Sequence, residues 1–334
     1  MTDVDPHGEA GGPGQEIELS FCVVNTSQRA LLVRGLDAIA RERETLPFAT
    51  EVLALDNGSR DGSAEAARDH PTVTAVVALD RRRGKALNDS DLLARARGRF
   101  ALLLNEDSEL QPGATMALWT ALREHPRAAC AGARLLRPDG SPQPCAWRFP
   151  TPLTALAGAL FLHRLLTVQS RGERVREVDW CQSAALLVRS EAAAQVGYLD
   201  PAFFVYSDEV DFARRLRDAG WLSLYVPAAV AIHHEQLSTD AAAERRIVEM
   251  ARNRDLYVRK HHSLSAALAV RLLTAWSYAV RALVALILPG HSPARYWWHV
   301  KASLRPAHGE GLREAAEEYN RRSSASDPEA LTRP

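Results

Sequence analysis

Two carboxylates in the first third of the chain lie where apolar runs end. Asp56 closes the run EVLALD, and Asp107 follows FALLLNE. In open sheets of parallel strands, ligands bind beyond the carboxyl ends of the strands. A carboxylate there suits hydrogen bonding to a ribose or a base, or binding a hard divalent cation that neutralises phosphate oxygens. Asp56 is therefore a candidate for nucleoside recognition, and Asp107 is a candidate cation ligand.

Both positions also have a structural interpretation. Asp56, Asn57 and Asp61 lie in the segment DNGSRDG, whose residue types form tight turns. Asp107 and Ser108 are residues that cap a following helix. On these residues alone, the binding and the structural interpretations both remain open.

Two further clusters of polar residues lie in the second half. The segment DEVD (208–211) begins an expected helix after the aromatic run FFVY, and HHE (233–235) follows an apolar run. Capping needs one acid, such as Asp208, and the apolar neighbours raise the proton affinity of a carboxylate toward that of a general base. The histidine pair is a candidate for metal binding or for hydrogen bonding to phosphate.

Basic residues lie in the loop after the third expected strand, at 81–83 and at Lys85. The chain has no Walker A loop and no strand-linked GxGxxG, which disfavours a P-loop NTPase and a standard dinucleotide dehydrogenase. A nucleotide diphosphate would then depend on a metal and on basic side chains. The alternative is an ordinary solvated basic loop.

Alternating strands and helices must position these groups. Apolar strand-like runs separated by helical stretches predict a parallel sheet covered on both faces, and thus a Rossmann-like α/β fold over the first 125 residues or so. The expected strands are 18–25, 51–57, 72–79 and 100–107, and the expected helices are 31–42, 63–70 and one that ends at Gly98.

The second half is more mixed. An Asp-Gly turn predicts a hairpin within 128–144, and Gly220 closes an amphipathic helix. The other expected elements are a connecting helix within 147–166, strands at 178–188 and 222–232, and a helix at 209–220. We expect a nucleotide-binding half (17–127) followed by an acceptor-binding half (128–262).

The composition is that of a globular protein of 334 residues, with 46% hydrophobic and 25% charged residues. Because 41 basic and 41 acidic residues cancel, a dedicated nucleic-acid binder is disfavoured. The four cysteines form no CxxC pair, so the sequence indicates neither a zinc site nor a disulfide framework, and it suggests a cytoplasmic setting. Residues 1–16 are expected to be a disordered leader without a signal sequence.

The most apolar segment is 264–288, which Arg271 and Arg281 interrupt. Its longest uncharged run is shorter than the roughly 20 residues of a spanning helix. The alternatives are a helix packed on the domain and one lying in a membrane interface, which nearby basic residues and YWWH (296–299) favour. We expect a helical appendage over 263–304 and a polar tail over 305–334, with the last twenty residues frayed.

Taken in order, six parts of the chain resemble the family 2 glycosyltransferases with a GT-A fold, and more narrowly their rhamnosyltransferase-like branch. The resemblance runs from about Leu19 to His262. Its segments are VVNTSQRALL, LALDNGSRDGSAE, LLLNEDSEL, VDWCQSAALLVRSEA with VGYLDPAFFVYSDEVDFARRLRDAGW, HHEQLST, and RNRDLYVRKHH.

The resemblance implies a GT-A domain over 17–262 that transfers a sugar, such as rhamnose or another hexose, with inversion. The donor would be a nucleotide-diphosphate sugar, and the acceptor a hydroxyl of a glycan or lipid-linked molecule at the inner face of the cell membrane. Asp107 and His233 would hold Mg²⁺ or Mn²⁺ against the diphosphate. The full set of expected donor contacts is Asp56, Asn57, Gly84, Lys85 and Asp107.

For the acceptor, the resemblance implies a catalytic base at Glu209 or Asp208. The family usually reads Glu-Asp-Val-Asp, whereas this chain has the first two acids in the reverse order. Trp180 is a candidate platform for a sugar face, with a core tryptophan as the alternative. The expected acceptor contacts are Trp180, Asp179 and Tyr206.

Several other positions depart from the family pattern. The usual glycine-rich loop appears as GKALNDS (84–90), Glu106 replaces a proline, Ser183 replaces a glycine, and a glycine pair is replaced at 235–236. These departures keep two other hypotheses open. One is a nucleotide-sugar-binding homologue without catalysis, and the other is a different nucleotide-dependent enzyme such as a nucleotidyltransferase.

Overall fold

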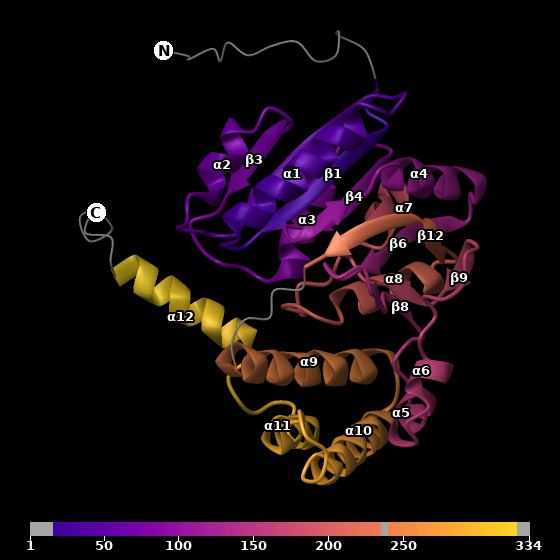
Figure 1. Cartoon of the computed structure of the whole chain (residues 1–334), viewed down its shortest axis with the longest axis vertical. Helices are drawn as coiled ribbons and strands as arrows, with labels where there is room; N and C mark the ends of the chain where they lie inside the picture. Colours follow the sequence, from indigo (N-terminus) through magenta and orange to yellow (C-terminus); the bar gives the residue numbers. More distant parts are fainter. Residues whose placement is uncertain (1–15, 235–239, 326–334) are drawn as a thin grey trace.

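A single mixed sheet dominates the fold of the computed structural model, which describes residues 16–234 and 240–325 (Figure 1). Its first half is the predicted parallel unit, in the order β3-β2-β1-β4. The strands are β1 (Leu19–Asn25), β2 (Thr50–Asp56), β3 (Ala75–Ala78) and β4 (Phe100–Asn105). Their carboxyl ends share one edge, so residues that follow β1, β2 and β4 meet there.

The second half extends the same sheet in the order β4-β11-β6-β12-β5. Strand β11 runs antiparallel to both β4 and β6, β12 is parallel to β6, and β5 is antiparallel to β12. The short strands β7 and β9 pair with β6 and β12, and β8 pairs with β10 in a separate small sheet. The bounds are β5 (Ser108–Leu110), β6 (Ala128–Leu136), β7 (Pro142–Gln143), β8 (Ala146–Trp147), β9 (Arg176–Val178), β10 (Trp180–Cys181), β11 (Ala185–Arg189) and β12 (Leu222–His233).

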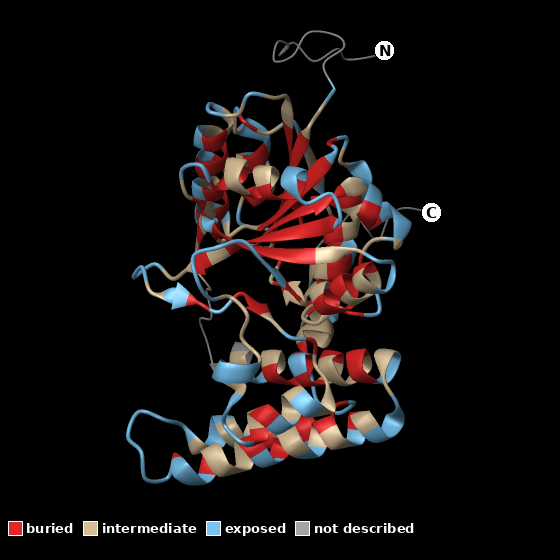
Figure 2. Ribbon diagram, turned by 90° about the vertical axis from the view of Figure 1, so that its right-hand side faces the viewer, coloured by how far each residue is buried: buried red, intermediate tan, exposed pale blue. Residues whose placement is uncertain are grey.

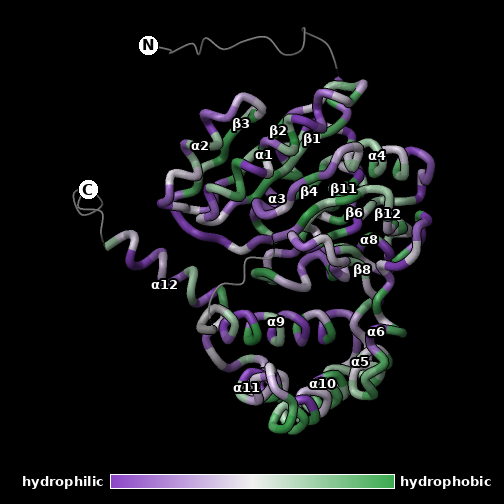
Figure 3. The backbone as a smooth tube through the Cα atoms, in the orientation of Figure 1, coloured by the Kyte–Doolittle hydropathy of each residue, from purple (hydrophilic) through white to green (hydrophobic). Residues whose placement is uncertain are grey.

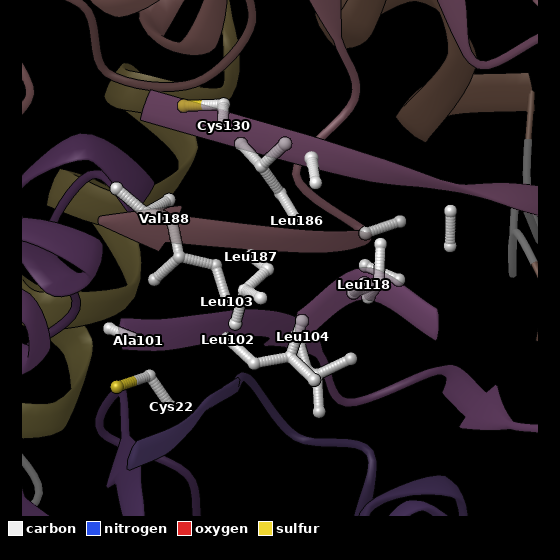
Figure 4. Packing of buried hydrophobic residues seen from close by; sticks show 14 of the residues in the cluster. Cys22, Ala101, Leu102, Leu103, Leu104, Leu118, Cys130, Leu186, Leu187 and Val188 are labelled. Carbon is white, nitrogen blue, oxygen red and sulfur yellow. The ribbon is translucent and has the colours of Figure 1, made fainter. Parts of the chain in front are cut away.

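Helices cover both faces of the sheet, which confirms the α/β fold class. They are α1 (Arg29–Arg43), α2 (Ser63–Asp69), α3 (Lys85–Arg95), α4 (Ala114–Glu124), α7 (Ser190–Gln195) and α8 (Asp208–Asp218). The central strands are buried on both sides (Figure 2), which explains their uninterrupted apolar sequences. In Figure 4, Leu102 and Leu103 of β4 pack among Leu186, Leu187 and Val188 of the neighbouring β11.

A glycine in β6 sets the distance between the main sheet and the small one. A side chain on Gly132 would overlap the side chain of Cys181 in β10. Because strand backbones at that position must approach closely, any larger residue would push β10 away from the sheet. This contact fixes the position of β10, which begins at Trp180 directly after Asp179.

A separate layer of helices lies beyond the sheet domain, at the bottom of Figure 1. It contains α5 (Pro152–Ala159), α6 (His163–Leu166), α9 (Asp240–His261), α10 (Leu264–Val284) and α11 (Pro293–Leu304). The buried carboxylate of Asp211 in α8 ties α9 to the sheet domain, because it lies 2.8 Å from Lys260 Nζ and 2.7 Å from His261 Nε2. The third acid of the DEVD segment is therefore a structural anchor.

Helix α10 combines a packed face with an exposed apolar face. By length and composition alone, it is the one helix in the described part of the chain that could cross a membrane, and 28% of its apolar window is buried. Leu264, Leu268, Leu272 and Trp276 recur every four residues and are all more than half exposed. Figure 3 shows hydrophobic residues gathered on α10 and on the neighbouring α5.

The expectation that the last twenty residues are frayed is wrong for residues 315–325. These residues belong to helix α12 (Leu312–Ala325), which contacts the sheet domain. The phenol of Tyr319 donates a hydrogen bond to the Gly58 carbonyl at 2.9 Å, and its ring lies 3.5 Å from the Arg82 guanidinium carbon. Residues 1–15 and 326–334, which include most of the expected leader and the end of the tail, lie outside the described residues.

Candidate active site

Strand β5 brings Asp107 next to His233. The register of β5 on β12 pairs Ser108 with His233, and the backbone N–H of His234 donates to the Asp107 carbonyl at 2.9 Å. As a result, Asp107 Oδ1 lies 3.3 Å from His233 Nε2, with both side chains largely buried. Residues 126 positions apart thus form one polar site at the edge of the sheet.

A hydrogen bond to Gln143 of β7 orients the His233 ring. Its Nδ1 lies 3.1 Å from Gln143 Oε1, and since a carbonyl oxygen only accepts, Nδ1 carries the hydrogen. Nε2 is then the ring nitrogen that faces Asp107. A second partner of this kind is what orients histidine ligands in metal sites.

His234, the neighbouring imidazole, belongs to a different group. Its Nε2 lies 2.6 Å from Glu109 Oε1, and Glu109 also pairs with Arg34 at 2.7 Å. The histidine pair recognised in the sequence therefore splits, and one ring faces Asp107 while the other faces α1.

The Asp107 and His233 pair is a donor set of one carboxylate and one imidazole. In the described part of the chain, no group of three or more His, Cys, Asp or Glu side chains is arranged for metal binding. A pair of protein ligands fits a divalent cation whose other positions are filled by substrate oxygens and water, as Mg²⁺ usually is. An imidazole ligand also suits Mn²⁺.

Lys85 lies among carboxylates at the start of α3. Its Nζ binds Asp89 and donates to Ser183 Oγ at 3.0 Å. Burial by itself lowers the pKa of Lys85, but Asp89 and the acids of α8 outweigh this effect, so the pKa is raised above its ordinary value. Lys85 is thus a fixed positive charge at the centre of the acidic site.

The loop before α8 approaches the start of α3 very closely. A side chain on Gly84 would lie 2.6 Å from the carbonyl oxygen of Phe204, and the Lys85 N–H donates to that same oxygen at 2.7 Å. Only glycine permits this approach. Gly84 therefore contributes by bringing Lys85 and the start of α8 together.

The two candidate catalytic acids begin α8 in different environments. Asp208 is fully buried, and neither carboxylate oxygen has a hydrogen-bond partner among the described residues. Glu209 is only partly buried, and its pKa is raised well above the ordinary value, first by burial and then by the Asp208 carboxylate. A raised pKa matches the requirement for a general base, and partial exposure makes Glu209 the accessible one of the two.

Backbone strain marks the same turn. Tyr206 and Ser207, which precede Asp208, both have positive φ angles, of 67° and 60°. Two consecutive residues other than glycine in the left-handed region cost conformational energy and tend to persist at functional sites. The turn leads directly into Asp208 and Glu209, which act electrostatically on Lys85.

A cleft of about 300 Å³ lies at the carboxyl ends of β1, β2 and β4. Asn57, Lys85 and Glu106 line it, together with Arg82 and Arg83 of the basic loop. Asp56 lies beneath this lining, and its oxygens accept hydrogen bonds from Asn25 Nδ2 at 2.8 Å and from the Ser59 N–H at 2.9 Å. Asp56 therefore stabilises the turn, as its structural interpretation predicts. Asn57, the next residue of the same turn, lines the cleft.

Glu106 and Asp89 belong to the site, although neither was among the predicted site residues. Burial and the neighbouring Asp107 raise the pKa of Glu106 to about 7, and the Thr26 N–H donates to its carboxylate at 3.3 Å. Asp89 is fully buried against Lys85. The spacing of four residues between Lys85 and Asp89 was a signal for that pair.

Helix α12 forms one wall of the cleft. Leu312, Ala315 and Ala316 line the cleft opposite the sheet edge. The side-chain amide of Asn320 makes two hydrogen bonds to the backbone of Arg82. It accepts one from the Arg82 N–H at 2.7 Å and donates one to the Arg82 carbonyl at 3.0 Å. The C-terminal helix is thus attached to the basic loop of the cleft.

The three expected acceptor residues are held by different elements. Trp180 stacks on Trp147 at a centroid distance of 4.6 Å. The Asp179 carboxylate accepts from the Phe149 N–H and from Arg217 Nη1, both at 2.9 Å, so it holds the loop of Trp180 in place. The Tyr206 hydroxyl accepts from Arg246 Nε of α9 at 2.6 Å.

Comparisons with known proteins identify relatives of this chain. Residues 16–279 match a family model described as "Glycosyltransferase like family 2". An N-acetylglucosaminyl-diphospho-decaprenol L-rhamnosyltransferase of Mycobacterium tuberculosis is 32% identical over an alignment of 242 positions, and the alignment covers 66% of this chain and 79% of that protein.

Two solved structures share the fold. The mannosyltransferase PcManGT of Pyrobaculum calidifontis, in complex with GDP-Man and Mn²⁺, has a TM-score of 0.53 and 16% identity, over 96% of this chain and 88% of that one. GalNAc-T7 with UDP, GalNAc and Mn²⁺ has a TM-score of 0.54 and 15% identity, over 95% and 59%. At these identities the likeness concerns the fold alone.

Glu209→Gln is expected to stabilise the protein, because it removes charge repulsion against the buried Asp208. The folded-state pKa of Glu209 is raised, so the wild type gains stability relative to the variant as the pH falls through that pKa. Near pH 8 the variant should melt about 2–4 °C higher, and near pH 5 the difference should shrink. Thermal melting at both pH values tests this, and a variant that melts below the wild type at about pH 8 would contradict it.

The double variant Tyr319→Ala/Asn320→Ala is expected to detach α12 from the basic loop. Hydrogen exchange over residues 312–325 should become faster, and the affinity for a nucleoside diphosphate should fall by about 3- to 10-fold because the cleft loses a wall. Arg321→Ala, an exposed change on the same helix, is the control. Tighter nucleotide binding by the double variant would instead show that α12 obstructs the cleft.

Proposed function

This chain belongs to the glycosyltransferase-like family 2, and from that membership we propose that it transfers a sugar with inversion from a nucleotide-diphosphate donor to a hydroxyl of a lipid-linked glycan acceptor. The main support is the contact of Asp107 with His233. Asp107 directly follows Glu106, which lines the cleft at the carboxyl ends of the strands. The relative named as a rhamnosyltransferase acting on a diphospho-decaprenol lipid supports rhamnose, or another hexose, as the sugar and a lipid diphosphate in the acceptor.

The donor nucleotide is proposed to bind in the cleft that Asn57, Arg82 and Arg83 line. Asp56 would contribute to nucleoside binding through the turn that it stabilises. Gly84 and Lys85 would lie beside the sugar diphosphate. In this scheme residues 17–127 supply the donor side and residues 128–262 the acceptor side of one domain.

Asp107 and His233 are the residues proposed to hold a divalent cation, Mg²⁺ or Mn²⁺. Bound there, the cation would neutralise the negative charge that develops on the diphosphate leaving group. The neighbours PcManGT and GalNAc-T7, both described with Mn²⁺, support this choice. The Gln143 contact keeps the His233 ring in the orientation that binding requires.

Glu209 is proposed as the catalytic base. Its carboxylate takes the proton of the acceptor hydroxyl while the acceptor oxygen bonds to the anomeric carbon and the bond from that carbon to the diphosphate oxygen breaks. One displacement inverts the anomeric carbon and needs no carboxylate nucleophile. Asp208 raises the pKa of Glu209, and Lys85 limits the repulsion between the acids.

The acceptor is proposed to approach past Trp180 and Tyr206, with Asp179 supporting the loop of Trp180. The exposed apolar residues of α10 and α5 favour action at the inner face of the cell membrane, on the pathway to a surface or cell-wall polysaccharide. Between the two interpretations left open by the sequence, the exposed stripe of α10 supports contact with the membrane interface.

The test is turnover of a panel of nucleotide-diphosphate sugars with Mn²⁺, with lipid-linked acceptor present. Wild type should release a nucleoside diphosphate. Asp107→Asn and Glu209→Gln should each lose at least about 100-fold in kcat/KM, because each removes a group that acts on the transition state. Glu209→Gln should keep the donor affinity of the wild type, whereas Asp107→Asn should lose the part of the donor affinity that depends on the metal ion.

Asp139→Asn, in the exposed turn between β6 and β7, is the matched control and should leave turnover unchanged. Metal-dependent turnover that survives Asp107→Asn would contradict the cation assignment. Release of pyrophosphate would indicate a nucleotidyltransferase. Nucleotide binding without turnover of any donor would indicate a binding homologue. A larger loss in Asp208→Asn than in Glu209→Gln would move the catalytic base to Asp208.

A further inference from the structure

A second cavity lies on the acceptor side of the molecule, and the proposed chemistry does not use it. Its volume is about 330 Å³, and residues of α5, α6, α9, α10 and the small sheet of β8 and β10 line it. It shares no lining residue with the donor cleft. Figure 1 shows these helices at the opposite end of the molecule from β3.

The lining of this cavity carries only positive charge. Arg148, Arg254, Arg281 and His163 line it, and no Asp or Glu does. Within the described ranges, none of the three arginines forms a salt bridge. Among the described residues, they donate hydrogen bonds to neutral oxygens, which are the Leu166 carbonyl and the hydroxyls of Thr274 and Ser277. Unpaired guanidinium groups that converge on one cavity are the arrangement that binds phosphate oxygens.

The neighbouring histidines respond to this excess of positive charge. Burial, followed by repulsion from Arg254, Arg295 and Arg281, lowers the pKa of His299 to about 4. Burial, followed by Arg281 and Arg164, also lowers the pKa of His163, whose buried Nδ1 has no hydrogen-bond partner among the described residues. A bound anion would relieve this repulsion, because no acidic side chain lines the cavity.

An exposed apolar surface adjoins the same cavity. Ser277 of α10 donates to the Gly158 carbonyl of α5 at 3.1 Å, so the two helices lie together at the cavity wall. Leu153 of α5 is 75% exposed, and Arg281 lies over the half-exposed ring of Phe161 at 5.1 Å. Figure 3 shows the hydrophobic colouring of this region. A basic cavity beside an apolar surface suits a ligand that has a charged head and an apolar chain.

The stacked tryptophans connect the cavity to the catalytic helix. Trp147 and Trp180 form part of its lining, and Trp180 also packs in the hydrophobic cluster that contains Val210 of α8. Val210 directly follows Glu209 in the sequence. A ligand whose phosphates occupy this cavity would therefore lie on the side of the molecule from which the acceptor is proposed to approach.

We infer that this cavity binds the diphosphate of the lipid-linked acceptor through Arg148, Arg254 and Arg281, with the lipid chain lying along the exposed apolar residues of α5 and α10. This inference rests on the proposed transfer to a lipid-linked acceptor and adds the place where the acceptor is held. Diphosphate supplies two or more negative charges, which matches three arginines without acidic partners. The stacked tryptophans bound the cavity beside the acceptor sugar.

Binding of farnesyl diphosphate, a soluble prenyl diphosphate, tests the assignment. Calorimetry is done with full-length protein in EDTA, so that the cation site makes no contribution. Arg148→Ala/Arg281→Ala should weaken binding by at least about tenfold, and Arg148→Lys/Arg281→Lys should recover part of it because the charge returns. Farnesol should bind far more weakly than farnesyl diphosphate, and inorganic pyrophosphate should compete with it.

Arg41→Ala/Arg68→Ala removes the same charge from exposed positions on α1 and α2 and should leave the affinity unchanged. Melting curves establish that each variant is folded. If the alanine variant destabilises the fold, Arg281→Gln alone serves instead, with a smaller expected loss of affinity. Unchanged affinity in folded arginine variants would overturn the inference, as would displacement of farnesyl diphosphate by UDP, which would place it in the donor cleft.

Two further results keep this inference separate from the proposed function. Binding of a nucleoside diphosphate with Mn²⁺, measured on the same protein, reports on the donor cleft alone. If the protein binds farnesyl diphosphate but no nucleoside diphosphate, the result counts against the proposed function and not against the assignment of the cavity. Binding to phosphatidylglycerol vesicles that needs the same arginines, and that farnesyl diphosphate does not displace, would assign the cavity to a bilayer headgroup and overturn the acceptor assignment.

Discussion

The antiparallel pairing of β5 with the end of β12 is the contact on which the candidate site depends. Strand β5 has only three residues, yet its register places Ser108 opposite His233 and so brings the Asp107 carboxylate within 3.3 Å of the imidazole. Every other part of the site is arranged around that edge. The cleft opens at the neighbouring strand ends, and α8 points its acids toward the same region through Lys85.

This arrangement concentrates negative charge in a buried region of the protein. Glu106 and Glu209 have raised pKa values because burial and neighbouring acids disfavour their ionised forms. Lys85, held between Asp89 and Ser183, supplies the nearby positive charge. The positive φ angles of Tyr206 and Ser207 add backbone strain at the same turn. Such features lower stability and are typical of sites selected for chemistry.

The sequence predicted the parts of the fold that local patterns encode. Continuous apolar runs gave the buried strands, and the Asp-Gly turn gave the hairpin of β6 and β7. Motif resemblance led to Asp107 and His233, but their contact depends on β5, which is too short to produce a recognisable period. The resemblance implied a nucleoside contact for Asp56, which stays a prediction; in the structure Asn25 and Ser59 donate hydrogen bonds to its oxygens, and Asn57 lines the cleft.

Long-range packing accounts for what the sequence did not reveal. Helix α12 is polar and looks like a solvated tail, and only its contacts with Arg82, 238 positions away, show that it forms a wall of the cleft. The arginines of the second cavity lie on three separate segments, at 148, 254 and 281, so no local motif joins them. Both features depend on how the C-terminal helices pack against the sheet domain.

The most direct test of the central claim is the gain in UDP affinity that Mn²⁺ provides, measured by calorimetry on the wild type, His233→Ala and His234→Ala. If Asp107 and His233 hold one cation against the diphosphate, Mn²⁺ should strengthen UDP binding to the wild type and to His234→Ala alike. In His233→Ala, the factor by which Mn²⁺ strengthens UDP binding should be at least about tenfold smaller. A gain that is undiminished in His233→Ala, or lost equally in His234→Ala, would contradict the account.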